Sequence, residues 1–349
     1  MQRVNHKEKD FPLGWLLIVV CALFALLSSH AHGQSAQRIE SVGVTVSDMD
    51  RSVDFYTHVL TFEKITDHEI WGSEFEHLTG VFGARARVVD MKLGDEKLEL
   101  TEYLTPQGRP VPIDSQSNDR WFQHVAIIVS DMDKAYQVLR MAKVRHASTA
   151  PQTLPSYITA AAGIRAFYFK DPDDHVLEIL QFPDGKGRPK WHDLAKTGQT
   201  FLGIDHTAIV VGDTNASLNF YQKALGLDLA GTSDNYGPEQ EHLNNVFGAK
   251  LHITGLKTHD DGINVEFLEY LAPRDGRPFP SDTRSSDLWH WQTSFAVENE
   301  SDLVAALLGK YRAQSISGGV VDFADATLGF RKAAIVRDPD GHAVRLEER

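Results

Sequence analysis

The side chains of this chain that can bind a metal or transfer protons are mainly imidazoles and carboxylates. Its 349 residues include 16 histidines and 48 aspartates and glutamates, but a single cysteine. One cysteine forms neither an internal disulfide nor a zinc site built on cysteine pairs. Any metal must therefore be bound by histidine and carboxylate groups. The formal net charge of −13 argues against nucleic acid as the main partner, because phosphate binding needs clustered lysines and arginines.

The first 33 residues have the three-part pattern of a secretory signal peptide. Basic residues precede an apolar run from Leu13 to Leu27, and the small residues Ala31 and Gly33 provide a cleavage site. The run is shorter than the roughly 20 residues that a membrane span needs. We therefore expect cleavage, a secreted or periplasmic protein, and no stable membrane insertion afterwards. The alternative is an uncleaved anchor that tethers the protein to a membrane. The only cysteine, Cys21, would leave with the signal.

The remainder of the chain is an internal repeat. The segment VGVTVSDMDRSVDFY at 42–56 matches TAIVVGDTNASLNFY at 207–221, and LELTEYLTP at 98–106 matches VEFLEYLAP at 265–273. Matches at a nearly constant offset indicate two copies of one domain. We expect these domains at residues 35–187 and 200–349. A linker at 188–199 would join them. It overlaps the end of a stretch rich in glycine, proline and lysine at 184–190.

Each half divides again into two modules. An alternating apolar strand opens each quarter, and the four strands are expected at residues 39–46, 123–130, 204–211 and 291–297. A capped amphipathic helix follows the strand, as at 50–60 and 131–142. Further short strands rich in Val, Phe and Leu come next, and an Asp-Pro-Asp turn introduces the last strand of each half. The pattern predicts an α+β fold of four βαβββ modules.

This organisation resembles the vicinal oxygen chelate superfamily, which includes glyoxalase I, extradiol dioxygenases, fosfomycin-resistance proteins and methylmalonyl-CoA epimerases. The resemblance rests on opening strands such as IDHTAIVV at 204–211, on the DPDGH turn at 338–342, and on their repetition over essentially all of 38–349. It implies mixed, curved sheets that enclose clefts. In each cleft of this family, paired modules supply metal ligands from their first and last strands.

The family's ligand positions carry a complete His/Glu pair in two modules only. Module 2 has His124 and Glu178, and module 3 has His206 and Glu266. Modules 1 and 4 have, at the same positions, Ser41, Glu99, Gln292 and Arg345. The resemblance therefore implies one divalent metal ion (Ni, Zn, Co, Mn or Fe) bound by two imidazoles and two carboxylates.

The pairing of the modules decides whether this ligand set is intact. Adjacent pairing, module 1 with 2 and 3 with 4, would leave both clefts with damaged sets. Exchanged pairing, module 2 with 3 and 1 with 4, gives one complete set and one cleft without a metal. Fused four-module glyoxalase I proteins are built in the exchanged way, and we favour it here. Arg345 would then neutralise Glu99 where a metal once lay.

Several other residues have two interpretations. His290 lies two residues before Gln292 and is a candidate substitute ligand, although most histidines on strands are structural. The aromatic stretches at 121–122 and 289–291 fit packing at the module joint better than a substrate box. Arg109 and Arg277 lie on long polar loops. Either these loops cover the cleft mouth and the arginines meet an anionic substrate, or the arginines are simply exposed.

The resemblance implies glyoxalase-I-like lyase or isomerase chemistry, in which a metal stabilises an enediolate on a small oxygenated substrate. A ligand glutamate would act as the general base, with Glu178 as the candidate and Glu266 as the other possibility. Export argues against a cytoplasmic thiol adduct as the substrate. The alternatives are a non-catalytic protein that sequesters small molecules and an extradiol-type dioxygenase. Both a monomer and a homodimer fit the sequence.

Overall fold

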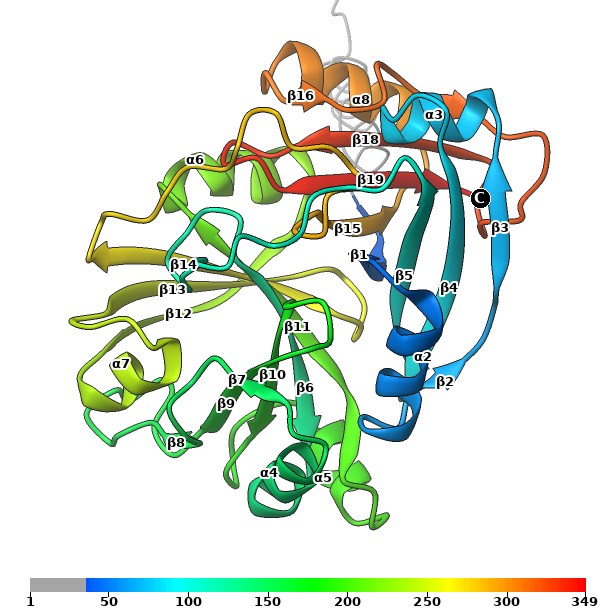
Figure 1. Cartoon of the computed structure of the whole chain (residues 1–349). Helices are drawn as coiled ribbons and strands as arrows, with labels where there is room; N and C mark the ends of the chain where they lie inside the picture. Colours follow the sequence, from blue (N-terminus) through cyan, green and yellow to red (C-terminus); the bar gives the residue numbers. More distant parts are fainter. Residues whose placement is uncertain (1–35) are drawn as a thin grey trace, which may run out of the picture.

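The computed structural model describes residues 36–349, and the predicted signal peptide at 1–33 lies outside the described residues. Within the described part, no helix has the length and apolar character that crossing a membrane requires. The chain forms four modules, with a short helix between the second and the third (Figure 1).

The first half of the chain contains modules 1 and 2. Module 1 comprises β1 (Arg38–Val46), α2 (Met49–His58), β2 (Glu63–Lys64), β3 (His68–Trp71), α3 (Ser73–Thr79), β4 (Arg85–Leu93) and β5 (Glu96–Thr105). Module 2 comprises β6 (Gln123–Val129), α4 (Met132–Met141), β7 (Arg145–His146), β8 (Gln152–Thr153), β9 (Arg165–Lys170) and β10 (Val176–Gln181). Helix α5 (Pro189–Ala195) follows within the predicted linker.

The second half contains modules 3 and 4, built on the same plan. Module 3 comprises β11 (Phe201–Val211), α6 (Thr214–Leu218) continuing into the π-helical turn η1 (Asn219–Ala224), β12 (Asp228–Tyr236), α7 (Pro238–Asn244), β13 (Lys250–Lys257) and β14 (Asn264–Ala272). Module 4 comprises β15 (Trp291–Ala296), α8 (Glu300–Gly309), β16 (Gln314–Ser315), β17 (Val321–Asp322), β18 (Lys332–Arg337) and β19 (Ala343–Glu348). The predicted α+β fold of four βαβββ modules is confirmed. The additional short helices α3 and α7 were not predicted.

The N-caps of the long helices show why they begin where they do. Helix α4 follows Asp131, whose carboxylate accepts the backbone N–H groups of Asp133 and Lys134. Helix α2 follows Asp48, which accepts the N–H of Arg51. A capping carboxylate satisfies N–H groups that have no partner inside the helix. The sequence analysis predicted this helix from residue 50, whereas the structure begins it at Met49, with Asp48 and not Asp50 as the cap.

The sheets join modules across the two halves of the chain. One sheet has the order β12-β13-β14-β11-β6-β10-β9-β7, so it contains modules 2 and 3 and is called here the 2/3 sheet. The other has the order β16-β18-β19-β15-β1-β5-β4-β2 and contains modules 1 and 4, the 1/4 sheet. The first strands form the antiparallel joints, β6 with β11 and β1 with β15. The exchanged pairing predicted from the sequence is confirmed (Figure 1).

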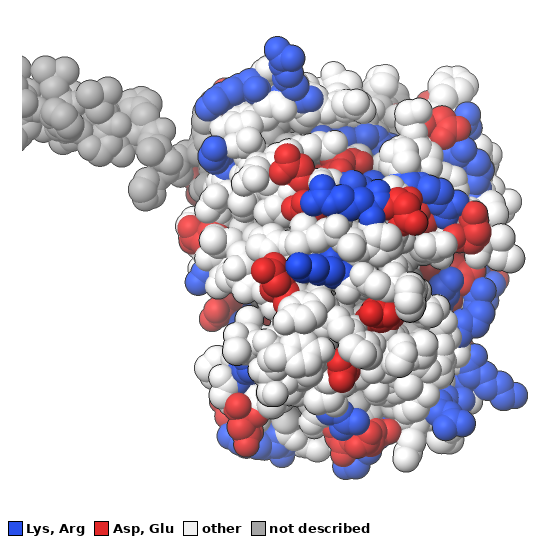
Figure 2. Space-filling view, turned by 90° about the vertical axis from the view of Figure 1, so that its left-hand side faces the viewer, with Lys and Arg blue, Asp and Glu red and all other residues white. Residues whose placement is uncertain are grey.

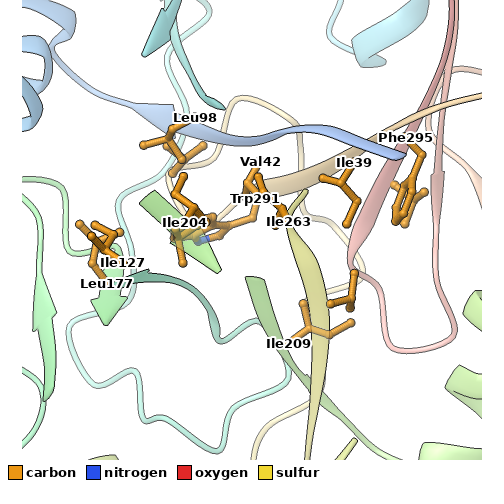
Figure 3. Close-up of a cluster of buried hydrophobic side chains, with 14 of the residues drawn as sticks. Ile39, Val42, Leu98, Ile127, Leu177, Ile204, Ile209, Ile263, Trp291 and Phe295 are labelled. Carbon is orange, nitrogen blue, oxygen red and sulfur yellow. The ribbon is translucent and has the colours of Figure 1, made fainter. Parts of the chain in front are cut away.

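The two sheets share one hydrophobic core between them. Val42, Leu98 and Phe295 of the 1/4 sheet belong to the same buried cluster as Ile127 and Leu177 of the 2/3 sheet (Figure 3). Side chains alternate along a strand, so one face of each sheet fills this shared core and the other face is left for a cleft. The sheet arrangement therefore yields two separate clefts.

Two loops of the same sequence type fasten the halves of the chain together. Arg109 donates to both carboxylate oxygens of Asp287, and Arg277 donates in the same way to Asp119. Arg277 also lies over the ring of Trp121 at 4.6 Å from its centroid. Such two-pronged ion pairs fix geometry as well as charge. Both arginines are bound at the joint between modules, which speaks for a structural role and against the alternative that they meet a substrate at the cleft mouth.

Charged side chains of both signs lie interspersed between uncharged residues on the face shown in Figure 2. This face therefore shows no single-sign basic field of the kind that nucleic acid binding uses.

The buried carboxyl group of Glu300 should make the stability of the fold depend on pH. Its side chain is fully buried at the start of α8, and neither carboxylate oxygen has a hydrogen-bond partner among the described residues. Burial, with the nearby carboxylate of Glu348, raises the pKa of Glu300 to about 8. A carboxyl whose pKa is higher when folded destabilises the fold as pH rises from its unfolded pKa of about 4.3 towards 8.

We therefore expect Glu300→Gln to melt like the native protein at pH 5 and about 3 °C or more above it at pH 9. Thermal denaturation at both pH values checks this. An equal shift at the two pH values would contradict the assignment, because an uncharged effect would not depend on pH.

Candidate metal and active site

Four strands of the 2/3 sheet carry the residues predicted as ligands. His124 lies on β6 and His206 on β11, the two strands of the central antiparallel joint. Glu178 lies on β10, parallel to β6, and Glu266 lies on β14, parallel to β11. The four side chains line one cavity on the sheet face that turns away from the shared core.

A β-bulge sets the direction of His206. In the β6–β11 register, Ile127 faces Ile204 and the next residue, Ala126, faces His206, so Asp205 is an extra residue on β11. In a regular strand, Ile204 and His206 would point to the same face. With the bulge, Ile204 enters the shared core and His206 enters the cleft. The strand alternation seen in the sequence gave no sign of this irregularity.

The distances bring the four predicted residues into one group, the His/Glu cluster. Nε2 of His124 lies 3.2 Å from Oε2 of Glu178, and Nε2 of His206 lies 3.6 Å from the same oxygen. Nε2 of His206 is also 3.2 Å from Oε2 of Glu266. One ligand atom each of His124, Glu178 and His206 lies within 4.8 Å of the others. Glu266 lies outside this group of three and contacts it through His206.

Asp205, which the sequence analysis did not single out, holds His206 in place. Its Oδ2 lies 3.1 Å from Nδ1 of His206, and its Oδ1 accepts the indole N–H of Trp191 at 2.8 Å. The guanidinium of Arg188 lies 3.1 Å from the same Oδ1. A carboxylate on Nδ1 fixes the ring so that Nε2 faces the cleft, the arrangement found behind metal-binding histidines. The signal in the sequence was the Asp that directly precedes His206.

These contacts shift the pKa values of Asp205 and His206 in opposite directions. Burial alone would raise the pKa of Asp205, but its hydrogen bond to His206 and the charges of His206 and Arg188 lower it to about 2. Burial would lower the pKa of His206, but the carboxylates of Glu266, Asp205 and Glu178 raise it to about 9. The same carboxylates that favour a proton on His206 would favour a metal cation in the cleft.

His124 provides the test of whether the cluster fits a metal. It is 1% exposed, and neither ring nitrogen has a hydrogen bond to any described residue. The contact with Glu178 has the length but not the geometry of a hydrogen bond. An unsatisfied buried polar group costs roughly 1–3 kcal/mol. Two imidazoles and two carboxylates are a donor set for a divalent transition metal, and a cation would satisfy His124.

The cavity around the cluster has room for a small molecule. Its volume is about 530 Å³, within the range of ligand pockets. It lies between the strands of modules 2 and 3, and helix α7 contributes Gln240 and Leu243 to its wall. Tyr168 packs against His124 with ring centroids 4.8 Å apart, which helps to hold the imidazole.

The corresponding positions of the 1/4 sheet form an ion-pair cluster with a filled cleft. Arg345 donates to Oε1 and Oε2 of Glu99 at 2.7 and 2.6 Å, and Gln292 donates to Glu99 at 3.3 Å. Glu347, which was not predicted, accepts from Nε of Arg345 at 2.6 Å. The cavity left beside these residues measures about 20 Å³. The predicted Glu99–Arg345 ion pair is confirmed, and the guanidinium is hydrogen-bonded to the carboxylates of both Glu99 and Glu347.

His290 and Ser41 do not repair this second cleft. The ring nitrogens of His290, like those of His124, have no hydrogen-bond partner among the described residues, but burial and the positive charges of Arg337 and Arg345 lower the pKa of His290 to about 3. A neighbouring arginine repels a metal cation as it repels a proton, so the structure speaks against His290 as a substitute ligand. Ser41 is buried on β1 opposite Ser294 in the antiparallel register.

Comparisons with known proteins agree with this geometry. The Glyoxalase/Bleomycin resistance protein/Dioxygenase superfamily model matches twice, at residues 38–179 and 203–346. A 2-epi-5-epi-valiolone epimerase of Actinomyces sp is 32% identical over 155 residues, 43% of this chain and 82% of the relative. A probable chloroplastic lactoylglutathione lyase of Arabidopsis thaliana is 26% identical over 216 residues, 59% of this chain and 52% of that protein. The match thus spans about half of the plant protein.

Among solved structures, a variant of glyoxalase I from Zea mays has a similar fold. It superposes with a TM-score of 0.61 at 17% identity, covering 93% of this chain and 96% of that chain. At this identity the likeness concerns the fold.

The Arg345 ion pair gives a prediction on stability. Arg345→Met leaves the carboxylates of Glu99 and Glu347 buried without their cation, so we expect the free energy of unfolding to fall by about 3–5 kcal/mol. Adding Glu99→Gln removes one stranded charge and should recover part of the loss. Chemical denaturation of the three proteins measures both effects. A loss below about 1 kcal/mol in the single variant would show that water reaches these carboxylates.

Proposed function

This chain belongs to the Glyoxalase/Bleomycin resistance protein/Dioxygenase superfamily, and we propose that it is a metal-dependent enzyme of the glyoxalase type. The reaction would move a proton at a carbon next to a carbonyl group of a small oxygenated substrate, as in a lyase or an epimerase. The observation that supports it most is the His/Glu cluster, in which ligand atoms of His124, Glu178 and His206 converge and the buried imidazole of His124 has no hydrogen-bond partner among the described residues. The relatives, a lyase and an epimerase by name, support the same class.

His124, His206 and Glu178 would hold the metal, with Glu266 as the fourth donor. When bound, the cation would supply a Lewis acid that polarises the carbonyl oxygen and stabilises negative charge on it. The second cleft would hold none, since Arg345 fills it. One divalent ion per chain is therefore part of the proposal, and its identity among Ni, Zn, Co, Mn and Fe is left open by this donor set.

From the geometry we propose Glu266, rather than Glu178, as the general base. Oε2 of Glu178 lies between the two imidazoles, and its side chain is 5% exposed. The side chain of Glu266 is 23% exposed towards the cavity and lies close to one imidazole, that of His206. The more accessible carboxylate is better placed to leave the cluster, take a proton from the substrate and return it. Glu178 then keeps the two histidines and the cation in position.

The predicted signal peptide extends the proposal to location. We propose that residues 1–33 direct the protein out of the cytoplasm, because they combine basic residues, a short apolar run and a small-residue cleavage site. The mature chain would contain no cysteine, which suits an oxidising compartment.

The assignment of the base gives a prediction with a matched control. The probe is 2-hydroxycyclohexanone in D2O, where the enzyme should exchange deuterium into the carbon next to the carbonyl group. In Glu266→Gln, the rate of this exchange should fall by about 10²–10⁴-fold, with metal still bound. Exchange is followed by NMR, and metal content by elemental analysis. Glu99→Gln, at the same strand position in the filled cleft, should leave exchange unchanged.

Two results would contradict the proposal in different ways. If Glu178→Gln stops exchange but keeps the metal while Glu266→Gln stays active, the base is Glu178. If metal-free protein binds the probe as tightly as metal-loaded protein and neither exchanges protons, the protein is a small-molecule binder and not an enzyme.

A further inference from the structure

The walls of the substrate cavity are mostly apolar. Away from the His/Glu cluster, aliphatic side chains from both modules line it, among them Leu154, Leu180, Ile253 and Leu268. Such walls accept a carbon skeleton but give no partner to a charged group. An ionised group that enters them without a partner pays a large desolvation cost.

The described residues that line the cavity offer no unpaired lysine or arginine to an anionic substrate. Among the residues that line it, Arg188 is the only lysine or arginine. Its guanidinium is already bound, 3.1 Å from Asp205 and 2.6 Å from the carbonyl oxygen of Gly262, and it lies over the ring of Trp191. Asp205 in turn holds His206, so an anion that captured Arg188 would disturb the cluster.

A row of uncharged amides supplies the polar part of the wall instead. Asn235 and Gln240 line the cavity, and Nδ2 of Asn235 donates to Oε1 of Gln240 at 2.9 Å. Gln240 donates onward to Asn244, whose amide donates to the hydroxyl of Tyr270 at 2.7 Å. The amide groups of Asn235 and Gln240 each have two N–H donors, of which the row uses one. The second N–H of each amide is the donor that a hydroxyl or carbonyl oxygen of a substrate would meet in this part of the wall.

We infer that the substrate is an uncharged carbonyl compound with hydroxyl groups, and that it carries no carboxylate or phosphate. The inference rests on the proposed function, since it concerns the same cavity. A divalent cation would balance the two glutamates, and Arg188 balances Asp205, which leaves no net charge to attract an anion. A glutathione adduct, with its two carboxylates, is selected against.

The test compares thiol adducts that differ in charge. The metal-loaded protein receives the hemithioacetals of methylglyoxal with N-acetylcysteine, which carries one carboxylate, and with N-acetylcysteine methyl ester, which carries no charged group. We expect kcat/KM for the ester to exceed that for the free acid at least tenfold. A preference for the free acid would overturn the inference.

Binding constants keep this inference separate from the proposed function. If neither adduct reacts, the S-methyl derivatives of the two thiols are used instead, and calorimetry measures the dissociation constant of each from the protein. Tighter binding of the ester supports an uncharged ligand even though catalysis has failed. Equal or tighter binding of the free acid contradicts it.

A new cation in the cavity should reverse the selectivity. Thr232 lines the cavity from β12 and is exposed, so a longer side chain fits there without disturbing the core. Thr232→Arg should improve the ratio of free acid to ester about tenfold, because a guanidinium pairs with a carboxylate through charge-assisted hydrogen bonds. Thr232→Gln, of similar length but neutral, should leave the ratio unchanged. If the two variants behave alike, charge is not what the cavity selects.

Discussion

The antiparallel pairing of β6 with β11, with its bulge at Asp205, is the constraint on which the site depends. It brings together the first strands of two modules that lie in different halves of the chain, and it puts their histidines on one face of one sheet. The bulge is what allows Ile204 to fill the shared core while His206 turns into the cleft. The last strands β10 and β14 then add a carboxylate on each side through parallel pairing.

The residue that forms the bulge also orients the site. Asp205 connects His206 to Trp191 and Arg188. Trp191 lies in helix α5, and Arg188 is the N-cap residue of that helix. Lys190 of the same helix forms an ion pair with Glu96 of β5, and Glu96 accepts the backbone N–H of Ile204. The segment between the two halves is therefore more than a connector. It ties the 1/4 sheet to the strand that carries His206.

The two clefts show how one scaffold resolves the same buried charges in two ways. In the 1/4 sheet, Arg345 satisfies Glu99 and Glu347 with fixed hydrogen bonds, and the cleft closes around them. In the 2/3 sheet, Glu178 stands at the position of Arg345, the imidazole of His124 has no hydrogen-bond partner among the described residues, and the cavity is open. A buried carboxylate needs a cation, and in this fold either a side chain or a metal ion fits that role.

The repeat predicted the modules, and the family resemblance, which assigned the ligand positions, made it possible to predict the exchanged pairing and the Glu99–Arg345 ion pair. The loss of His and Glu in modules 1 and 4 carried the information on pairing, since only one pairing leaves a complete set. The bulge, helices α3 and α7, and the role of Asp205 were not predictable in this way. Strand alternation counts residues as if every strand were regular, and the partner of Asp205 is a tryptophan that only the folded linker brings near.

The most direct test of this account is the metal content of the purified mature protein and of two variants, measured by elemental analysis. The account predicts one transition-metal ion per chain in the native protein and in Ser41→Ala, and none in His124→Ala. Two ions per chain, or one that persists in His124→Ala, would contradict it, because the metal would then lie outside the His/Glu cluster.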